Sequence, residues 1–346
     1  MPTLNRTKEE TLKILKWGSI AVGIIILFFI AIKTLTFVAN LITPPSPPAA
    51  AFGKLPEIPF PEQTRENLSY SLDTLTGFLP IFPDRAKVCK ITTEAPTLLG
   101  LDKTQEKVFK IGFESSGTQI AEDIYQWVDQ NKNLQRKITI NIFSSDFNLS
   151  SSYLLAQSLQ PLSGQEEKTD TIKVAKAFLS DMSLLPKDLD DKKTKITLYS
   201  IEKSMLIPTS KISDAKIAKV DFFQKDINDL PIYYDEGISS TISFSIGKEN
   251  KVSKVLEARF FHKNISEENT TYAIKTASEA FAELQGGKAY VAYKPADVVE
   301  FTIKKIFLGY YLGENEQEYL MPVVVFEGSN DFVAYVSAIK DEWVRN

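Results

Sequence analysis

The sequence has 346 residues, of which 43% are hydrophobic and 24% are charged, as is typical of a globular protein with a sizeable core. The net charge is −4, and residues 1–33 hold five Lys or Arg but only two Glu, so the rest of the chain is acidic. An acidic chain without a basic block argues against nucleic-acid binding, which needs clustered Lys and Arg to neutralise phosphates.

The first predicted element is a transmembrane helix over residues 17–42, which read WGSIAVGIIILFFIAIKTLTFVANLI. The stretch from Trp17 to Ile32 carries no charge, and the whole segment is long enough to cross a hydrocarbon core of about 30 Å with some tilt. Lys33 fits the outer interface, where its stem lies along lipid while its ammonium group reaches water. We therefore expect the chain to contact membrane lipid through this segment.

A cleaved signal peptide is the alternative for the same segment, because Ala49 and Ala51 offer a small-residue cleavage site. However, the apolar stretch exceeds the usual apolar region of about 7–15 residues, and these alanines lie far beyond it. Four Lys or Arg precede the span, and none lies between Lys33 and Lys54. The positive-inside rule then places a tail of residues 1–16 in the cytoplasm and the C-terminal domain in an extracytoplasmic position at the cell membrane.

A proline-rich linker is expected over residues 43–65, because residues 43–63 contain a proline every few positions. Proline fixes φ and lacks an N–H donor, so this stretch should be extended and free of regular hydrogen bonding. Such a linker is a semi-rigid spacer that holds the following domain away from the bilayer.

Helical spacing of apolar residues predicts two helices in the rest of the chain, over residues 170–182 and 272–287. The second ends at Gly286 and Gly287, and a third helix is expected over residues 213–224 with Ser213 as its N-cap. The segments IKVAKAF and IKTASEAF of the first two helices differ by one inserted residue, and strands follow each helix. This likeness suggests two copies of one unit of helix and antiparallel sheet.

Strand patterns predominate elsewhere, and consecutive strands have no helices between them, so the sheets should be mostly antiparallel with helices packed on one face. We expect an α+β fold with a first subdomain over residues 66–165 and a second over residues 166–346. The pair at 238–261 should form a hairpin through the GKEN turn. The expected strands are 137–143, 195–201, 238–247, 251–261 and 298–311.

The stretch over residues 307–339 is expected to be the last meander of a sheet. The segment YLMPVVVFEG within it is apolar on both faces, which indicates a central or covered strand. Pro322 cannot donate to a ladder, so a bulge or a locally free edge should lie there. Glu314, Glu316 and Glu318 fall in the preceding turn, where carboxylates are usually solvated.

Residues that could support catalysis are few. Cys89 is the only cysteine and is expected to be a small buried hydrophobic residue, with an intermolecular disulfide or a reactive thiol as the alternative. His262 is the only histidine and is expected to lie in a strand or loop without a catalytic role. Phosphate-binding loops, nucleophile elbows and zinc-protease motifs are absent from the sequence. No catalytic residue, cofactor or metal site is therefore expected.

Segments of the C-terminal half carry a resemblance to a known family: LPIYYDEGISSTISFSIGKENKVSKV, then TASEAFAELQGG, then FTIKKIFLGYY with YLMPVVVFEG and FVAYVSAI. Residues 170–340 resemble the extracytoplasmic region of YycH/YycI-type regulatory proteins and related PepSY-like domains. The resemblance implies one N-terminal transmembrane helix, an outer α+β domain without catalytic residues, and modulation of a membrane sensor histidine kinase.

We therefore expect a single-pass membrane protein, not an enzyme, whose extracytoplasmic domain binds a partner and modulates a membrane signalling or envelope complex. The partner is expected to be a membrane protein such as a sensor kinase. The alternative is a cell-envelope hydrolase that acts on peptidoglycan or protein. The lack of a recognisable nucleophile and base in the sequence favours binding.

Overall fold

The computed structural model describes residues 49–345 apart from residues 65, 93–96, 130–133, 157 and 238, together with Trp17, residues 27–29, Lys33 and Thr34. The expected cytoplasmic tail and most of the expected transmembrane helix, residues 17–42, lie outside the described residues. In the part that is described, no helix is both long and apolar enough to cross a membrane. The chain divides into residues 1–47 and a second unit, residues 48–346, which holds the sheets.

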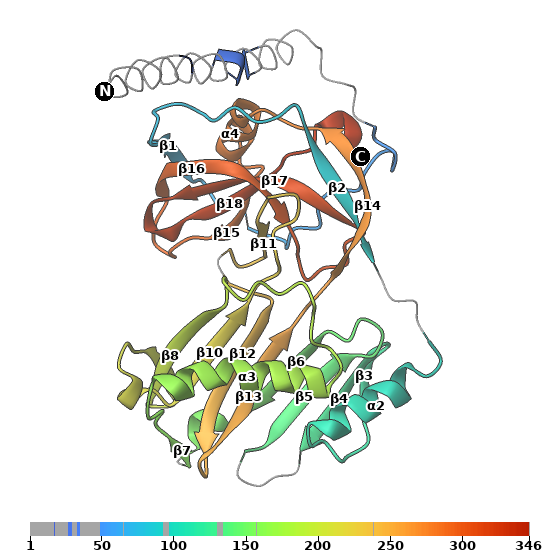
Figure 1. The fold of residues 1–346 in the computed structure, drawn as a ribbon, viewed down its shortest axis with the longest axis vertical. Coiled ribbons are helices and arrows are strands. Elements are labelled where there is room, and N and C mark those ends of the chain that lie inside the picture. Colours follow the sequence, from blue (N-terminus) through green and yellow to red (C-terminus); the bar gives the residue numbers. More distant parts are fainter. Residues whose placement is uncertain are drawn as a thin grey trace, which may run out of the picture. The chain divides into compact units, whose positions relative to one another are not determined.

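One sheet of the second unit has eight strands (Figure 1). Its main order is β1-β16-β17-β18-β15, with β11 also paired to β16, and with β2 linking β17 to β14. The pairs are antiparallel except for β1 and β11, which run parallel to β16. The helix α4 (Ala277–Gln285) packs on β18. The strands are β1 (Ser69–Leu72), β2 (Arg85–Thr92), β11 (Ile232–Tyr233), β14 (Asn264–Ala273), β15 (Tyr290–Tyr293), β16 (Glu300–Tyr311), β17 (Tyr319–Gly328) and β18 (Val333–Ser337).

The other sheet has ten strands, all antiparallel, in the order β3-β4-β5-β6-β13-β12-β10-β8-β9, with β7 paired to β12. The helices α2 (Gly100–Lys110) and α3 (Gln165–Asp181) share one core cluster with this sheet, and Figure 1 shows both on the same face. The strands are β3 (Thr118–Ala121), β4 (Ile124–Asp129), β5 (Arg136–Asn141), β6 (Phe147–Ser151), β7 (Leu159–Gln160), β8 (Lys195–Glu202), β9 (Met205–Pro208), β10 (Ile217–Phe222), β12 (Ile242–Glu249) and β13 (Val252–Phe260).

These layers give an α+β fold of mostly antiparallel sheets. Strands from both sides of the expected boundary at residue 165 pair within one sheet, because β6 pairs with β13 and β7 pairs with β12. The two similar helical segments also differ in position. Residues 172–178 lie inside α3, whereas residues 274–276 precede α4 and the helix begins only at Ala277.

The expected hairpin at 238–261 is confirmed as β12 and β13, which turn at Asn250 and Lys251 with φ of 50° and 64°. Two positive φ values in a two-residue loop match the right-handed twist of the flanking strands. The expected helix over residues 213–224 is wrong, because Ile217–Phe222 form the strand β10. A short apolar run does not separate helix from strand by periodicity, and here pairing with β8 and β12 decides.

The expected meander is confirmed, and β17 is buried on both faces from Tyr319 to Phe326. Pro322 lies in this central strand opposite Tyr310, without a bulge at that pair. Its carbonyl accepts from the N–H of Ala338 just past the end of β18, so its missing N–H faces the end of that ladder. The Ala338 carbonyl accepts instead from the N–H of Lys275 at 2.7 Å. The expectation of a bulge or a free edge is therefore wrong: Pro322 is paired on both sides, and its missing N–H is tolerated because the Ala338 carbonyl has another donor.

Residues 49–63 of the expected linker have no regular secondary structure, but they belong to the folded unit. Leu55 is 0% exposed and Ile58 is buried in the core of the eight-stranded sheet. Leu55 also bridges to Val344 near the C-terminus, through hydrogen bonds with Trp343 and Arg345 of 2.8 and 2.7 Å. This part of the segment is therefore not a spacer, because Leu55 and Ile58 pack in that core.

Candidate functional site

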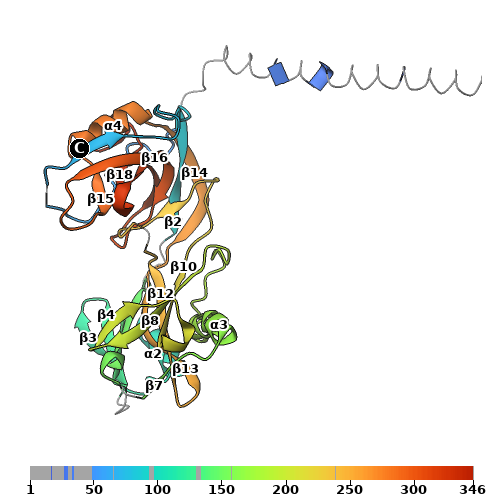
Figure 2. The ribbon, with the colours of Figure 1, turned by 90° about the vertical axis from the view of Figure 1, so that its left-hand side faces the viewer.

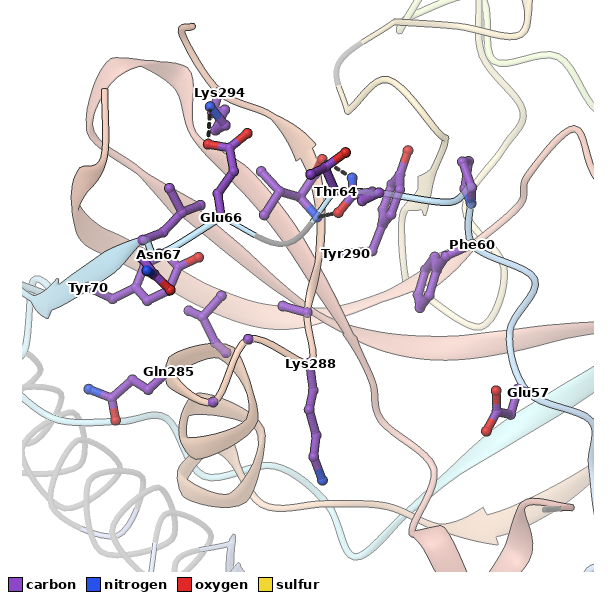
Figure 3. Close-up of a pocket in the computed structure, with 18 residues that line it drawn as sticks. Glu57, Phe60, Thr64, Glu66, Asn67, Tyr70, Gln285, Lys288, Tyr290 and Lys294 are labelled. Atoms are coloured by element: carbon purple, nitrogen blue, oxygen red, sulfur yellow. Dashed lines mark hydrogen bonds and ion pairs between the residues drawn. The ribbon is translucent and has the colours of Figure 1, made fainter. Parts of the chain in front are cut away.

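A groove of about 910 Å³ lies beside the eight-stranded sheet (Figure 3). One wall is the segment 57–70, which leads into β1. The other wall is the end of α4, the turn that follows it and β15. Gly287 in that turn has a φ of +71°, a conformation that favours glycine, and it redirects the chain from the helix into the strand.

Phe60 fixes the position of the first wall. Its ring stacks on Tyr290 with centroids 5.1 Å apart and an interplanar angle of 3°, and it meets Tyr311 edge-on at 4.6 Å. Pro59 and Pro61 flank it and favour an extended backbone. The aromatic contact therefore holds the segment against the sheet at the point where the groove begins.

Gln63 closes the edge of the sheet. β15 lies at one end of the strand order, so its outer backbone groups have no neighbouring strand on that path. The side-chain amide of Gln63 pairs with both of these groups at Val291, donating to the carbonyl at 2.6 Å and accepting from the N–H at 2.9 Å. One amide side chain thus makes the two hydrogen bonds that another strand would make.

The charged groups of the groove are of both signs. Lys294 pairs with Glu66 at 2.9 Å, and Lys288 and Glu57 also line the walls. Burial, together with the negative charge of Glu66, raises the pKa of Tyr70. Tyr70 therefore remains a neutral hydroxyl at physiological pH, able to donate one hydrogen bond and accept others.

A cluster of tyrosines supports the back of the groove. Burial raises the pKa of Tyr290 to about 12, with further contributions from the charges of Asp235 and Glu236. The Tyr290 hydroxyl donates to the backbone carbonyl of Asp235 at 2.8 Å, and the Tyr311 hydroxyl donates to the Asp235 carboxylate. That carboxylate also accepts from the N–H of Glu314 at 3.1 Å. These contacts join Tyr290 and Tyr311 to Asp235, and the raised pKa of each tyrosine keeps it in the neutral form.

A second hollow of about 520 Å³ contains His262 and Asp146. The buried imidazole of His262 lies just after β13, in the loop that the sequence allows, and pairs with Asp188 at 2.9 Å. Burial alone would raise the pKa of Asp188, but hydrogen bonds from His262 and Gln224 and the charge of His262 together lower it. Gln224 donates to Asp188 at 2.7 Å and to the carbonyl of Lys263 at 3.2 Å. His262 and Asp188 thus belong to a hydrogen-bonded network that Gln224 extends to the backbone of Lys263.

The other residues considered for chemistry do not form a common site. Cys89 is buried in β2, as expected, where burial raises the pKa of its thiol. Glu314 pairs with Arg259 and is half-buried, so the expectation of a solvated carboxylate is wrong for this residue. Glu316 and Glu318 are exposed, as expected, and line the second hollow. Neither Gln63 nor Val291 carries a sequence signal that could have indicated the groove.

Comparisons with known proteins give little beyond this geometry. No protein-family model matches the sequence, and no curated protein matches it. A crystal structure of an uncharacterized protein from Eubacterium rectale ATCC 33656 is similar over 76% of this chain and 86% of that one, with 14% sequence identity and a TM-score of 0.33. A similarity of this size carries no inference about fold or function.

Proposed function

We propose that this chain is a single-pass membrane protein whose extracytoplasmic unit binds an extended segment of a partner protein. Gln63 carries this proposal, because it occupies the edge of β15 with the hydrogen bonds of a strand. An extended peptide that added to this edge would make the same two bonds at Val291 and displace the amide. The groove of about 910 Å³ beside the edge gives room for its side chains.

The proposed role is regulatory rather than catalytic. The groove offers hydroxyl, amide and paired charged groups, which hold a ligand through hydrogen bonds, and its tyrosines stay neutral at physiological pH. The resemblance to YycH/YycI-type regulatory proteins suggests a membrane sensor kinase as the partner. The apolar residues 17–42 would hold the unit beside such a protein in the membrane.

Photo-crosslinking in intact cells tests the proposal with the full-length chain. A photoreactive amino acid at Lys288 lies in the groove, and the same group at Val252, exposed at the start of β13, serves as the control. Val291→Pro removes the outward N–H that an added strand needs. Gln63→Ala removes the amide that competes for the edge.

We expect a membrane protein to crosslink at Lys288 and not at Val252. The yield should fall with Val291→Pro and stay equal or rise with Gln63→Ala, because the latter exposes the edge. Equal yields at both positions, or a yield that Val291→Pro leaves unchanged, would contradict binding at this edge. Crosslinking to peptidoglycan instead of protein would favour the alternative of a cell-envelope hydrolase.

A further inference from the structure

The loop between β1 and β2, residues 73–84, exposes large apolar side chains. Residues 74–83 read TLTGFLPIFP and include no charged residue. Leu75, Phe78 and Ile81 are 104%, 78% and 99% exposed. Single exposed apolar residues are ordinary on protein surfaces, but three large ones on one uncharged loop indicate a contact surface.

Internal contacts hold these side chains outward. The Thr74 hydroxyl donates to the carbonyl of Phe78 at 2.9 Å, and the N–H of Gly77 donates to the carbonyl of Thr74 at 2.9 Å. Leu79 and Phe82 are partly buried against the core of the eight-stranded sheet. Leu79 and Phe82 thus fix the loop to the sheet, while Leu75, Phe78 and Ile81 remain exposed.

The loop lies at the end of the sheet where the chain enters the folded unit. The N–H of Ala50 donates to the carbonyl of Thr271 on one side of β14, and on the other side the N–H of Ile274 donates to the carbonyl of Asp84. With strands about 4.8 Å apart and residues about 3.3 Å apart along a strand, Ala50 and Asp84 are about 14 Å from each other. Figures 1 and 2 show the loop crossing this end of the unit.

The predicted membrane span ends at Ile42, and an extended chain from there to Ala49 reaches at most about 25 Å. We propose that residues 74–83 insert Leu75, Phe78 and Ile81 into the lipid interface as a second membrane contact. This inference rests on the proposed anchor over residues 17–42. Lipid is the occupant because the loop has apolar side chains without charges, which suits the boundary between headgroups and acyl chains.

Fluorescence in nanodiscs of phosphatidylcholine tests this contact with the full-length chain. In a Cys89→Ala background, Phe78→Cys carries an environment-sensitive dye, and Leu155→Cys carries it in the control. Leu155 is also an exposed leucine, but it follows β6 of the ten-stranded sheet. Nanodiscs with and without nitroxide-labelled lipid then report whether the dye touches the bilayer.

We expect the dye at position 78 to shift its emission to the blue and to lose intensity with nitroxide lipid, while the dye at position 155 changes in neither respect. Leu75→Ser with Ile81→Ser should reduce this quenching while the chain still co-elutes with the nanodiscs. A chain that co-elutes but shows no quenching at position 78 would overturn the proposed contact alone. A chain that does not co-elute would overturn the anchor itself. The nanodiscs contain no partner protein, so quenching reports lipid.

Discussion

Leu55→Ala should lower the free energy of unfolding of the second unit by about 3 kcal/mol, within the range of about 2–5 kcal/mol for truncating a buried leucine. Leu55 is 0% exposed and packs in the core of the eight-stranded sheet. Its backbone is fixed between Trp343 and Arg345 by hydrogen bonds of 2.8 and 2.7 Å. The surrounding atoms therefore have little freedom to fill the cavity that the substitution leaves.

Urea denaturation of residues 48–346, followed by circular dichroism, measures this change. Leu155→Ala is the matched control, because it removes the same atoms from a side chain that is 75% exposed and should change stability by less than about 0.5 kcal/mol. A chain that begins at residue 64 should be less stable than either variant, since it lacks Leu55, Ile58 and Phe60 together. Equal unfolding midpoints for Leu55→Ala and Leu155→Ala would refute the assignment and return residues 49–63 to the role of a spacer.

Three further substitutions test the core, the exposed turn and an ion pair. Phe326→Ala removes a fully buried aromatic ring of β17 and should lower the free energy of unfolding by about 3–5 kcal/mol in chemical denaturation. Glu316→Ala in the exposed turn should lower it by less than about 0.5 kcal/mol. The reverse order would show that the turn is the critical element. Hydrogen bonds from Lys248 and Ser163 lower the pKa of Glu167 from 4.5 to about 2, so its contribution to stability is present above pH 4.5 and is lost as the pH falls to about 2. Glu167→Gln should therefore be less stable than the parent at pH 6, and this difference should shrink as the pH falls through about 2; a difference that stays the same from pH 6 to below pH 2 would contradict this.

Local sequence patterns predicted the features that depend on neighbouring residues. The apolar faces of Tyr319–Phe326 correctly indicated a covered strand. The start of α4 also has a local signal in the sequence. Thr276 and Glu279 form a capping box, which places the helix boundary at Ala277 rather than at residue 272.

Long-range pairing decided the features that sequence reasoning missed. The strand β14 reads NISEENTTYA, a polar sequence that forms a strand because β2 pairs with it from a distant part of the chain. Gln63 lies 228 positions from Val291, and one glutamine among prolines gives no sign of such a partner. The groove is formed by segments that meet only after folding, so no local pattern could reveal it.

The chain between the predicted membrane span and β1 connects the predicted anchor to the groove beside β15. It first supplies Leu55 to the core, then Phe60 to the aromatic cluster and then Gln63 to the edge of β15. Only two positions separate Phe60 from Gln63, so the stacked ring limits how far the amide can move from Val291. A partner strand at this edge must displace Gln63 while Phe60 still holds the segment. Under the proposed function, binding at the groove would act on the same segment that leads to the predicted anchor, and a partner could in this way shift the position of the unit relative to the membrane.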